Sequence, residues 1–178
     1  MKTTKYFYDC EFNEDGKTIE LISIGFVSED GRKLYLENTD IDFTKVNPWV
    51  KENVIPHLWS RQKDKSLYNE WSLNNMNFGG LMSKKDMSIE IERFCNIKNG
   101  KPEFWGYYSA YDFVALCQIF GTMMELPEGY SRYTNDLKQL AVSLGNPKLP
   151  DQNSTKHNAL ADAEWNKQVY EFLLSLNK

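Results

Sequence analysis

The first third of the chain alternates strand-like runs with Asp-Gly turns, and this pattern restricts the possible folds more than any other feature. Residues 5–12 alternate as a strand, and residues 13–17 contain the Asp-Gly pair typical of a hairpin turn. Residues 18–27 form the next apolar run, and a second turn at 29–32 leads to a short third run at 33–37. The chain is therefore predicted to open with three consecutive antiparallel strands.

The rest of the chain adds helices and further strands. Helical periodicity predicts helices at about 83–98, 110–120, 136–144 and 158–176. Two more strands are predicted at 103–108 and 130–135, and the tryptophan-rich stretch 38–80 is predicted to form short helices and loops on the sheet edge. The order β-β-β-α-β-α-β-α predicts an α/β fold, with a mixed five-stranded sheet of three antiparallel strands and then parallel additions, flanked by helices.

Length and charge narrow the classes of protein. The 178 residues contain neither a repeat nor a linker, so we expect a single domain over residues 1–178. The formal net charge is −4, which argues against a protein that coats duplex DNA through clustered lysines and arginines. An enzyme that grips one strand end is still compatible with this charge.

The sequence predicts a cytoplasmic protein with no membrane partner. No apolar stretch approaches the roughly 18–20 residues of a membrane span, and acidic residues follow the N-terminus too closely for a signal peptide. The three cysteines, Cys10, Cys95 and Cys117, form no CxxC pair and lie in apolar segments. We expect them to be reduced, buried thiols.

Asp9 and Glu11 form the first candidate site. Residues two apart on a strand point to the same face, so both carboxylates lie on one side of the first strand. On a central strand the two acids repel each other and lose hydration unless a cation lies between them. The alternative is a hairpin end where both acids reach solvent.

Two further segments carry acids at the ends of predicted elements. Asp112 falls in the first turn of a helix that follows a strand, and Asp162 falls in the first turn of the last helix. His157 is predicted to belong to the preceding loop, with Asn158 as the N-cap. Each acid alone is explained equally well by the helix dipole, and His157 alone by an exposed loop.

Taken together, these motifs resemble those of the DEDDh family of 3'-5' exonucleases. Asp9-Cys10-Glu11 matches the first motif, Asp112 the second, and His157 with Asp162 the third. More narrowly, the chain resembles small bacterial exoribonucleases related to ribonuclease T, to which residues 11–12, 15–25 and 157–163 are similar in sequence. The similarity covers nearly the whole chain except residues 38–82 and the loop before His157.

The resemblance implies a ribonuclease H-like fold, a homodimer, and metal-dependent release of nucleoside 5'-monophosphates from the 3' end of single-stranded RNA. It implies two Mg²⁺ ions, for which Mn²⁺ can substitute. Asp9 would bridge both ions, Glu11 and Asp162 would complete one site, and Asp112 would serve the other. His157 would take a proton from the attacking water. Carboxylate oxygen is the ligand that such hard cations prefer.

Substrate contacts are predicted beside these motifs. Phe12 and Trp105 are candidate stacking surfaces for the terminal bases, with core packing as the alternative for each. Glu11 and His157 are also expected to contact the substrate. The basic residues Arg61, Lys63 and Lys65 have two interpretations: they contact backbone phosphates, or they form a solvated charge run. His57 has no acidic motif beside it and is predicted to be structural.

Two other functions are compatible with the same motifs. One is a DNA 3'-5' exonuclease of the proofreading type, because the sequence does not reveal a contact to the 2'-hydroxyl. The other is a catalytically silent nucleic-acid-binding module that keeps the fold. The presence of all five motif residues disfavours the silent module.

Overall fold

The computed structural model describes residues 2–62, 77–152 and 157–176. The strands of the described part are β1 (Thr3–Glu14), β2 (Ile19–Ser28), β3 (Lys33–Asn38), β4 (Asn77–Met82), β5 (Lys101–Gly106) and β6 (Asn135–Asp136). Its α-helices are α1 (Pro48–Asn53), α3 (Lys84–Phe94), α4 (Ala110–Phe120), α5 (Leu137–Ser143) and α6 (Ala159–Ser175). Short 3₁₀ turns are η1 (Ile55–His57), η2 (Trp59–Arg61), η3 (Ile97–Asn99) and η4 (Met123–Glu125).

The described strands form one six-stranded mixed sheet in the order β4-β3-β2-β1-β5-β6. The pairs β1–β2 and β2–β3 are antiparallel, which confirms the predicted opening of three antiparallel strands. Strands β4, β5 and β6 each join in parallel. The predicted α/β architecture, with helices flanking a mixed sheet, is therefore confirmed.

The predicted count of five strands was wrong because the sheet has a sixth strand, β4, in the stretch predicted as helices and loops. It pairs with the outer side of β3. Glycines at 79 and 80 weaken the strand pattern of this segment. A Cβ on Gly79 would lie 3.1 Å from the ring of Trp59, so the missing side chain leaves room for the indole.

The last strand is also shorter than predicted. β6 comprises only Asn135 and Asp136, whereas the prediction placed a strand at 130–135. Tyr130 instead packs in the core against Phe104, with ring centroids 5.5 Å apart. The side chain of Asn135 donates to the backbone oxygen of Phe104 at 3.1 Å. Tyr130 is thus held by packing of its side chain and not by the strand hydrogen bonds that the prediction implied.

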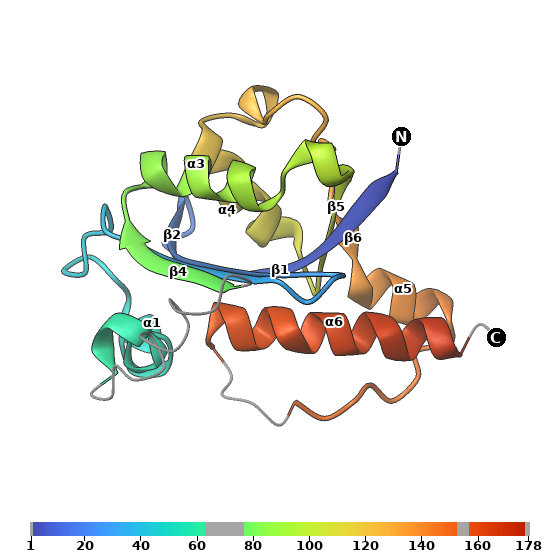
Figure 1. Ribbon diagram of the computed structural model, residues 1–178. Helices are drawn as coiled ribbons and strands as arrows, with labels where there is room; N and C mark the ends of the chain where they lie inside the picture. Colours follow the sequence, from blue (N-terminus) through green and yellow to red (C-terminus); the bar gives the residue numbers. More distant parts are fainter. Residues whose placement is uncertain (1, 63–76, 153–156, 177–178) are drawn as a thin grey trace.

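Helices cover both faces of the sheet (Figure 1). Helices α3 and α4 lie on one face, where Met87, Ile91 and Leu116 pack with Tyr6 and Tyr8 of β1 in the main core. Helix α6 runs along the opposite face. This two-sided cover buries β1, the central strand, and limits the positions at which polar groups on it can be reached.

Residues 39–61, which we call the α1 segment, pack beside the sheet with a small core of their own. Val46, Val50, Val54 and Leu58 contact Ile22 of β2. The N-cap of α1, Asn47, accepts a hydrogen bond from the backbone of Val50. The prediction of short helices is confirmed for the α1 segment, but the segment packs on Ile22 of the inner strand β2 and not on an edge strand.

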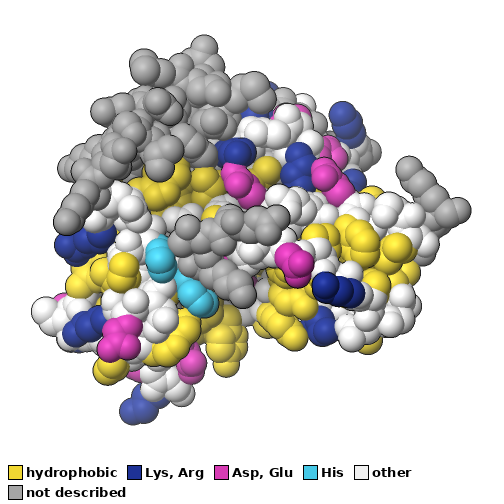
Figure 2. All heavy atoms as spheres, turned by 90° about the horizontal axis from the view of Figure 1, so that it is seen from below, with side chains coloured by type: hydrophobic (Ala, Val, Ile, Leu, Met, Phe, Trp, Pro, Cys, Tyr) yellow, Lys and Arg dark blue, Asp and Glu magenta, His cyan; other side chains and the backbone are white. Residues whose placement is uncertain are grey.

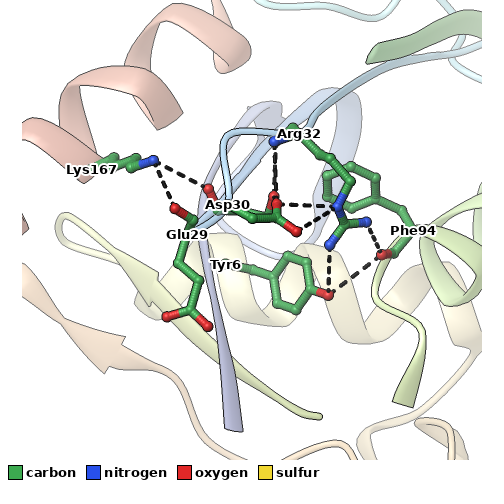
Figure 3. A network of polar contacts seen from close by, with 7 residues as sticks. Tyr6, Glu29, Asp30, Arg32, Phe94 and Lys167 are labelled. Atoms are coloured by element: carbon green, nitrogen blue, oxygen red, sulfur yellow. Dashed lines mark hydrogen bonds and ion pairs between the residues drawn. The ribbon is translucent and has the colours of Figure 1, made fainter. Parts of the chain in front are cut away.

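A polar network fixes the turn at residues 29–32, between β2 and β3 (Figure 3). The guanidinium of Arg32 binds Asp30, donates to the backbone oxygen of Phe94 at 2.9 Å and lies over the Phe94 ring. Lys167 of α6 donates to the backbone oxygen of Glu29 at 3.2 Å. The turn is thereby tied to α3 on one face and to α6 on the other.

All three cysteines are buried and free of disulfides, as predicted. Among the described residues, no helix has both the length and the apolar character needed to cross a membrane.

Candidate active site

Asp9 and Glu11 lie on β1, on the face that α6 covers. The neighbours Tyr8 and Cys10 point into the core under α3 and α4, so strand alternation directs both acids the other way. β1 pairs with β5 only as far as Phe7, and a bulge follows between Glu11 and Phe12. The two acids therefore lie where β1 extends past the end of its parallel neighbour.

Asp112 comes from α4, which begins shortly after β5 ends. Its Oδ1 accepts a hydrogen bond from the backbone N–H of Cys10 at 2.9 Å. The carboxylate thus binds the β1 backbone between Asp9 and Glu11, at a position where β5 no longer pairs with it. The predicted place of Asp112 in the first helical turn is confirmed.

Asp162 lies in the first turn of α6, as predicted, and Asn158 is the N-cap. The Asn158 side chain accepts from the N–H of Ala161 at 3.1 Å. One turn after Asp162, Asn166 is buried and donates to the backbone oxygen of Tyr8 at 2.9 Å. Two asparagines, one turn before and one turn after Asp162, therefore fix this stretch of α6 against the rest of the site.

The structure brings three of the four predicted acids into direct proximity. Asp9, Glu11 and Asp162 each offer a carboxylate oxygen, and these oxygens lie within 4.8 Å of one another. Asp112 lines the same cavity. Three clustered carboxylates, with a fourth in the same cavity, form an all-oxygen donor set, which suits a hard divalent cation.

The pKa values of the cluster indicate how strongly it needs positive charge. Burial and repulsion from Asp162 and Asp112 raise the pKa of Glu11 to about 8. The pKa of Asp112 is raised to about 7, mainly by burial. Burial followed by repulsion from Asp112, Asp162 and Glu11 raises the pKa of Asp9 well above its usual range. A bound cation would offset both causes, so the donor set fits a metal site.

His157 precedes α6 and lines the same cavity. Its backbone has φ of 61°, in the left-handed region that residues other than glycine seldom adopt. The neighbouring loop also reaches the acids, because Gln152 donates to Oδ1 of Asp162. The predicted position of His157 in the loop before the helix is confirmed.

The acids and His157 line a cavity of about 620 Å³ whose other walls are partly aromatic. Phe12 lies on this wall and contacts Tyr111 edge-on, with ring centroids 6.0 Å apart. Tyr107, Tyr108 and Trp165 line it as well. Tyr108 is 66% exposed, and its ring meets that of Tyr107 edge-on with centroids 4.8 Å apart.

Trp105 lies outside this cavity. Its ring packs on Tyr170 of α6 with centroids 4.7 Å apart, and its indole N–H donates to Glu103 at 2.7 Å. Alternation with Phe104 and Gly106 directs this side chain to the face that α6 covers, which is also the face of the acids. Trp105 pairs with Phe7, however, two residues before Asp9, so its ring packs on α6 below the cavity and does not line it. These contacts support core packing, the alternative weighed for Trp105.

The basic run contributes little that the structure describes. Arg61 is exposed and lies over the ring of Phe43, while Lys63 and Lys65 fall outside the described residues. On the face seen in Figure 2, lysines and arginines are scattered among acidic side chains, with no continuous basic patch among the described residues visible there. The backbone oxygen of His57 accepts a hydrogen bond from Asn158 at 3.0 Å, and the structural role of the His57 side chain stays a prediction.

Several residues of the site were not found from the sequence. Asn166 repeats the spacing of Asn158 and Asp162 at four-residue steps, and this periodicity could have indicated it. Gln152, which donates to Asp162, and Trp49, whose ring contacts that of His157, gave no such signal. They lie in a polar loop and in the tryptophan-rich middle, which reach the site only through tertiary packing.

Comparison with known proteins places this geometry in a family. The model of the 3'-5' exoribonuclease Rv2179c-like domain matches residues 4–174. The chain is 39% identical over 160 residues to the 3'-5' exoribonucleases Rv2179c and MT2234.1 from two strains of Mycobacterium tuberculosis, H37Rv and CDC 1551. These matches cover 89% of this chain and 86% of each relative.

Among solved structures, the catalytic unit of Neurospora crassa Pan2, with its protease and nuclease domain, matches 97% of this chain at 16% identity and a TM-score of 0.39. The match spans 28% of that chain. The family assignment rests on the family model and the mycobacterial relatives alone. Since the family model matches nearly the whole chain, the chain belongs to the Rv2179c-like 3'-5' exoribonuclease family.

Proposed function

We propose that this chain is a metal-dependent exoribonuclease that removes nucleoside 5'-monophosphates from the 3' end of single-stranded RNA. The observation that carries the proposal is the convergence of Asp9, Glu11 and Asp162, whose oxygens lie within 4.8 Å of one another. Family membership supports the substrate class and the direction.

The proposed metal ligands are Asp9, Glu11, Asp112 and Asp162, the four acids of a DEDDh arrangement. Two divalent ions, Mg²⁺ or Mn²⁺, would when bound polarise the phosphodiester and neutralise charge on the attacking and leaving oxygens. The raised pKa of Glu11 supports this assignment, because a carboxyl group with a pKa of about 8 is ionised at neutral pH only in part without a cation.

His157 is the proposed general base. It lines the cavity of the acids, and a neutral imidazole has a free electron pair on one ring nitrogen, so it can accept the proton of the attacking water. The acids themselves are unsuited to this task once they hold cations. Their charge would then be committed to the metal ions and not to a proton.

The proposed path of the RNA follows the aromatic wall. Phe12 is partly exposed, lies one residue after Glu11 and lines the cavity, so it is placed to stack on a terminal base. Tyr108 offers a second exposed ring on the same wall. We leave Trp105 out of the proposed substrate contacts because its ring packs on Tyr170.

The proposal treats residues 1–178 as one exonuclease domain acting as a homodimer, with the dimer resting on family resemblance. Light scattering of the purified protein tests the oligomeric state. Matched single-stranded RNA and DNA oligonucleotides, each with Mn²⁺, test the substrate. Release of mononucleotides from RNA at a much higher kcat/KM supports the proposal, and preference for DNA contradicts it.

A further inference from the structure

The α1 segment places an exposed tryptophan against the proposed general base. Trp49 lies on α1 and is 54% exposed, which is unusual for so large an apolar ring. Its ring meets that of His157 edge-on, with centroids 5.1 Å apart and an angle of 85° between the planes. Such T-shaped pairs are attractive and directional.

Two hydrogen bonds fix the α1 segment relative to the acids. The backbone N–H of Asn47, the N-cap of α1, donates to Oδ1 of Asn13 at 2.9 Å. Asn13 is buried on β1, two residues after Glu11. The other bond runs from Asn158, next to His157, to the backbone oxygen of His57 at 3.0 Å. The segment is therefore tied both to the strand and to the helix that carry the acids.

The local backbone does not hold His157 in place by its own preference. A φ of 61° is costly for a histidine, so this conformation persists only where surrounding contacts determine it. The side-chain oxygen of Asn158 accepts from the N–H of Ala161, and its side-chain nitrogen donates to the backbone oxygen of His57. Trp49 contacts the imidazole of His157 itself. These contacts come from the α1 segment on one side and from α6 on the other.

We infer that Trp49 is a positioning residue that holds the His157 imidazole over the acid cluster, and that the α1 segment is the brace that carries it. This inference rests on the proposed function, in which His157 is the base. It assigns a role to the part of the tryptophan-rich middle that the structure describes. The role is to orient a catalytic group, and it requires no contact between Trp49 and RNA.

The first test observes the ring contact in solution without metal or substrate. The chain has two histidines, so His157→Ala assigns the imidazole signals in a proton NMR spectrum. Trp49→Ala is expected to shift the His157 ring signals and leave those of His57 in place, while Trp49→Phe keeps most of the ring-current shift. Unchanged His157 signals in Trp49→Ala would overturn the inference.

The second test separates positioning from RNA binding. Misplacing a catalytic group by about 1 Å costs up to about 100-fold in rate, so Trp49→Ala is expected to lower kcat by about 10- to 100-fold with little change in KM. Trp49→Phe should recover most of the loss. Lys51→Ala, an exposed change on the same helix, is the matched control and should behave as wild type.

The last arm is a double-mutant cycle. Because Trp49 is inferred to act through His157, Trp49→Ala should cause no further loss in the His157→Ala background. The same fold-loss in both backgrounds, or a rise in KM alone, would overturn the inference. Full activity of His157→Ala would instead contradict the proposed function, and the NMR result would still report on the brace.

Discussion

Gly25 lies directly opposite Asp9 in the β1–β2 ladder, and its missing side chain lets α6 approach the acids. A Cβ on Gly25 would lie 2.4 Å from the backbone oxygen of Ala159 and 2.5 Å from Cα of Leu160. The first turn of α6 therefore rests on β2 at the point where β2 pairs with Asp9. This close approach places Asp162 beside Asp9 and Glu11.

Gly25→Ala is expected to lower both stability and metal affinity. The added methyl group meets backbone atoms that cannot rotate away, so α6 must shift, at a cost of roughly 1–3 kcal/mol in free energy of unfolding. The shift would separate Asp162 from Asp9 and weaken Mn²⁺ binding. Urea unfolding and calorimetric Mn²⁺ titration measure the two effects.

Gly79→Ala is the matched control for this change. It also adds a methyl group to a strand glycine, but on the edge strand β4, where the nearest atoms would be the ring of Trp59 at 3.1 Å and the backbone oxygen of Tyr35 at 3.2 Å. We expect it to cost stability while Mn²⁺ affinity is unchanged. Wild-type Mn²⁺ affinity in Gly25→Ala would show that the close approach of α6 does not position Asp162.

Without divalent metal, the protein is expected to lose stability as the pH rises. The pKa of Glu11 is about 8 and that of Asp112 about 7, whereas both are near 4 in an unfolded chain. The folded state binds these protons more tightly than the unfolded chain does. The stabilisation that this proton binding contributes is therefore fully present below about pH 4. It is lost as the pH rises through about 7 and 8.

The measurement is urea unfolding in EDTA at pH 5.5 and pH 8, repeated with Mg²⁺. The free energy of unfolding should be lower at pH 8 in EDTA, and Mg²⁺ should restore more stability at pH 8 than at pH 5.5. A free energy that is equal at both pH values in EDTA would contradict the assignment of raised pKa values to these acids.

Asp9→Asn is expected to stabilise the metal-free protein while abolishing mononucleotide release. The change removes repulsion from Glu11, Asp112 and Asp162, and one pKa unit of relief corresponds to about 1.4 kcal/mol. The variant should unfold at higher urea than wild type in EDTA at pH 8 and gain little from Mg²⁺. Glu14→Gln, an exposed change on the same strand, is the control. Retained Mg²⁺ stabilisation in Asp9→Asn would count against the metal site.

Phe12→Ala and Trp105→Ala are expected to differ in kind. Phe12 lines the cavity, so its loss should raise KM for RNA by roughly 5- to 150-fold, the range that a stacking contribution of about 1–3 kcal/mol allows. Trp105→Ala removes a ring packed on Tyr170, so it should lower the melting temperature with little change in KM. The reverse pattern would restore Trp105 as a stacking surface.

The elements with strong local signals were predictable from the sequence. The Asp-Gly turns and the alternating runs predicted β1 to β3, and the cap at Asn158 predicted the start of α6 together with the places of His157 and Asp162. The sequence also indicated which carboxylates share a face of β1. In each case the signal and the structure it predicts lie within one turn or one strand.

What the sequence missed depends on contacts between distant segments. Strand β4 has two glycines and is a strand because it pairs with β3, and Trp49 reaches His157 only because the α1 segment packs on Ile22. Trp105 adjoins the second motif in the sequence, yet its ring packs on Tyr170 of α6 and does not line the cavity of the acids. Proximity in sequence to a motif therefore did not predict proximity to the site.

Metal-dependent 3'-5' exoribonuclease activity is tested by identifying the products of one RNA. A single-stranded oligonucleotide labelled at its 5' end is incubated with the protein and Mn²⁺, and the released species are identified by mass spectrometry. We expect labelled RNA shortened stepwise from the 3' end, nucleoside 5'-monophosphates as products, and no release in EDTA. Internal cleavage, products carrying a 2',3'-cyclic phosphate, or release that persists in EDTA would contradict it.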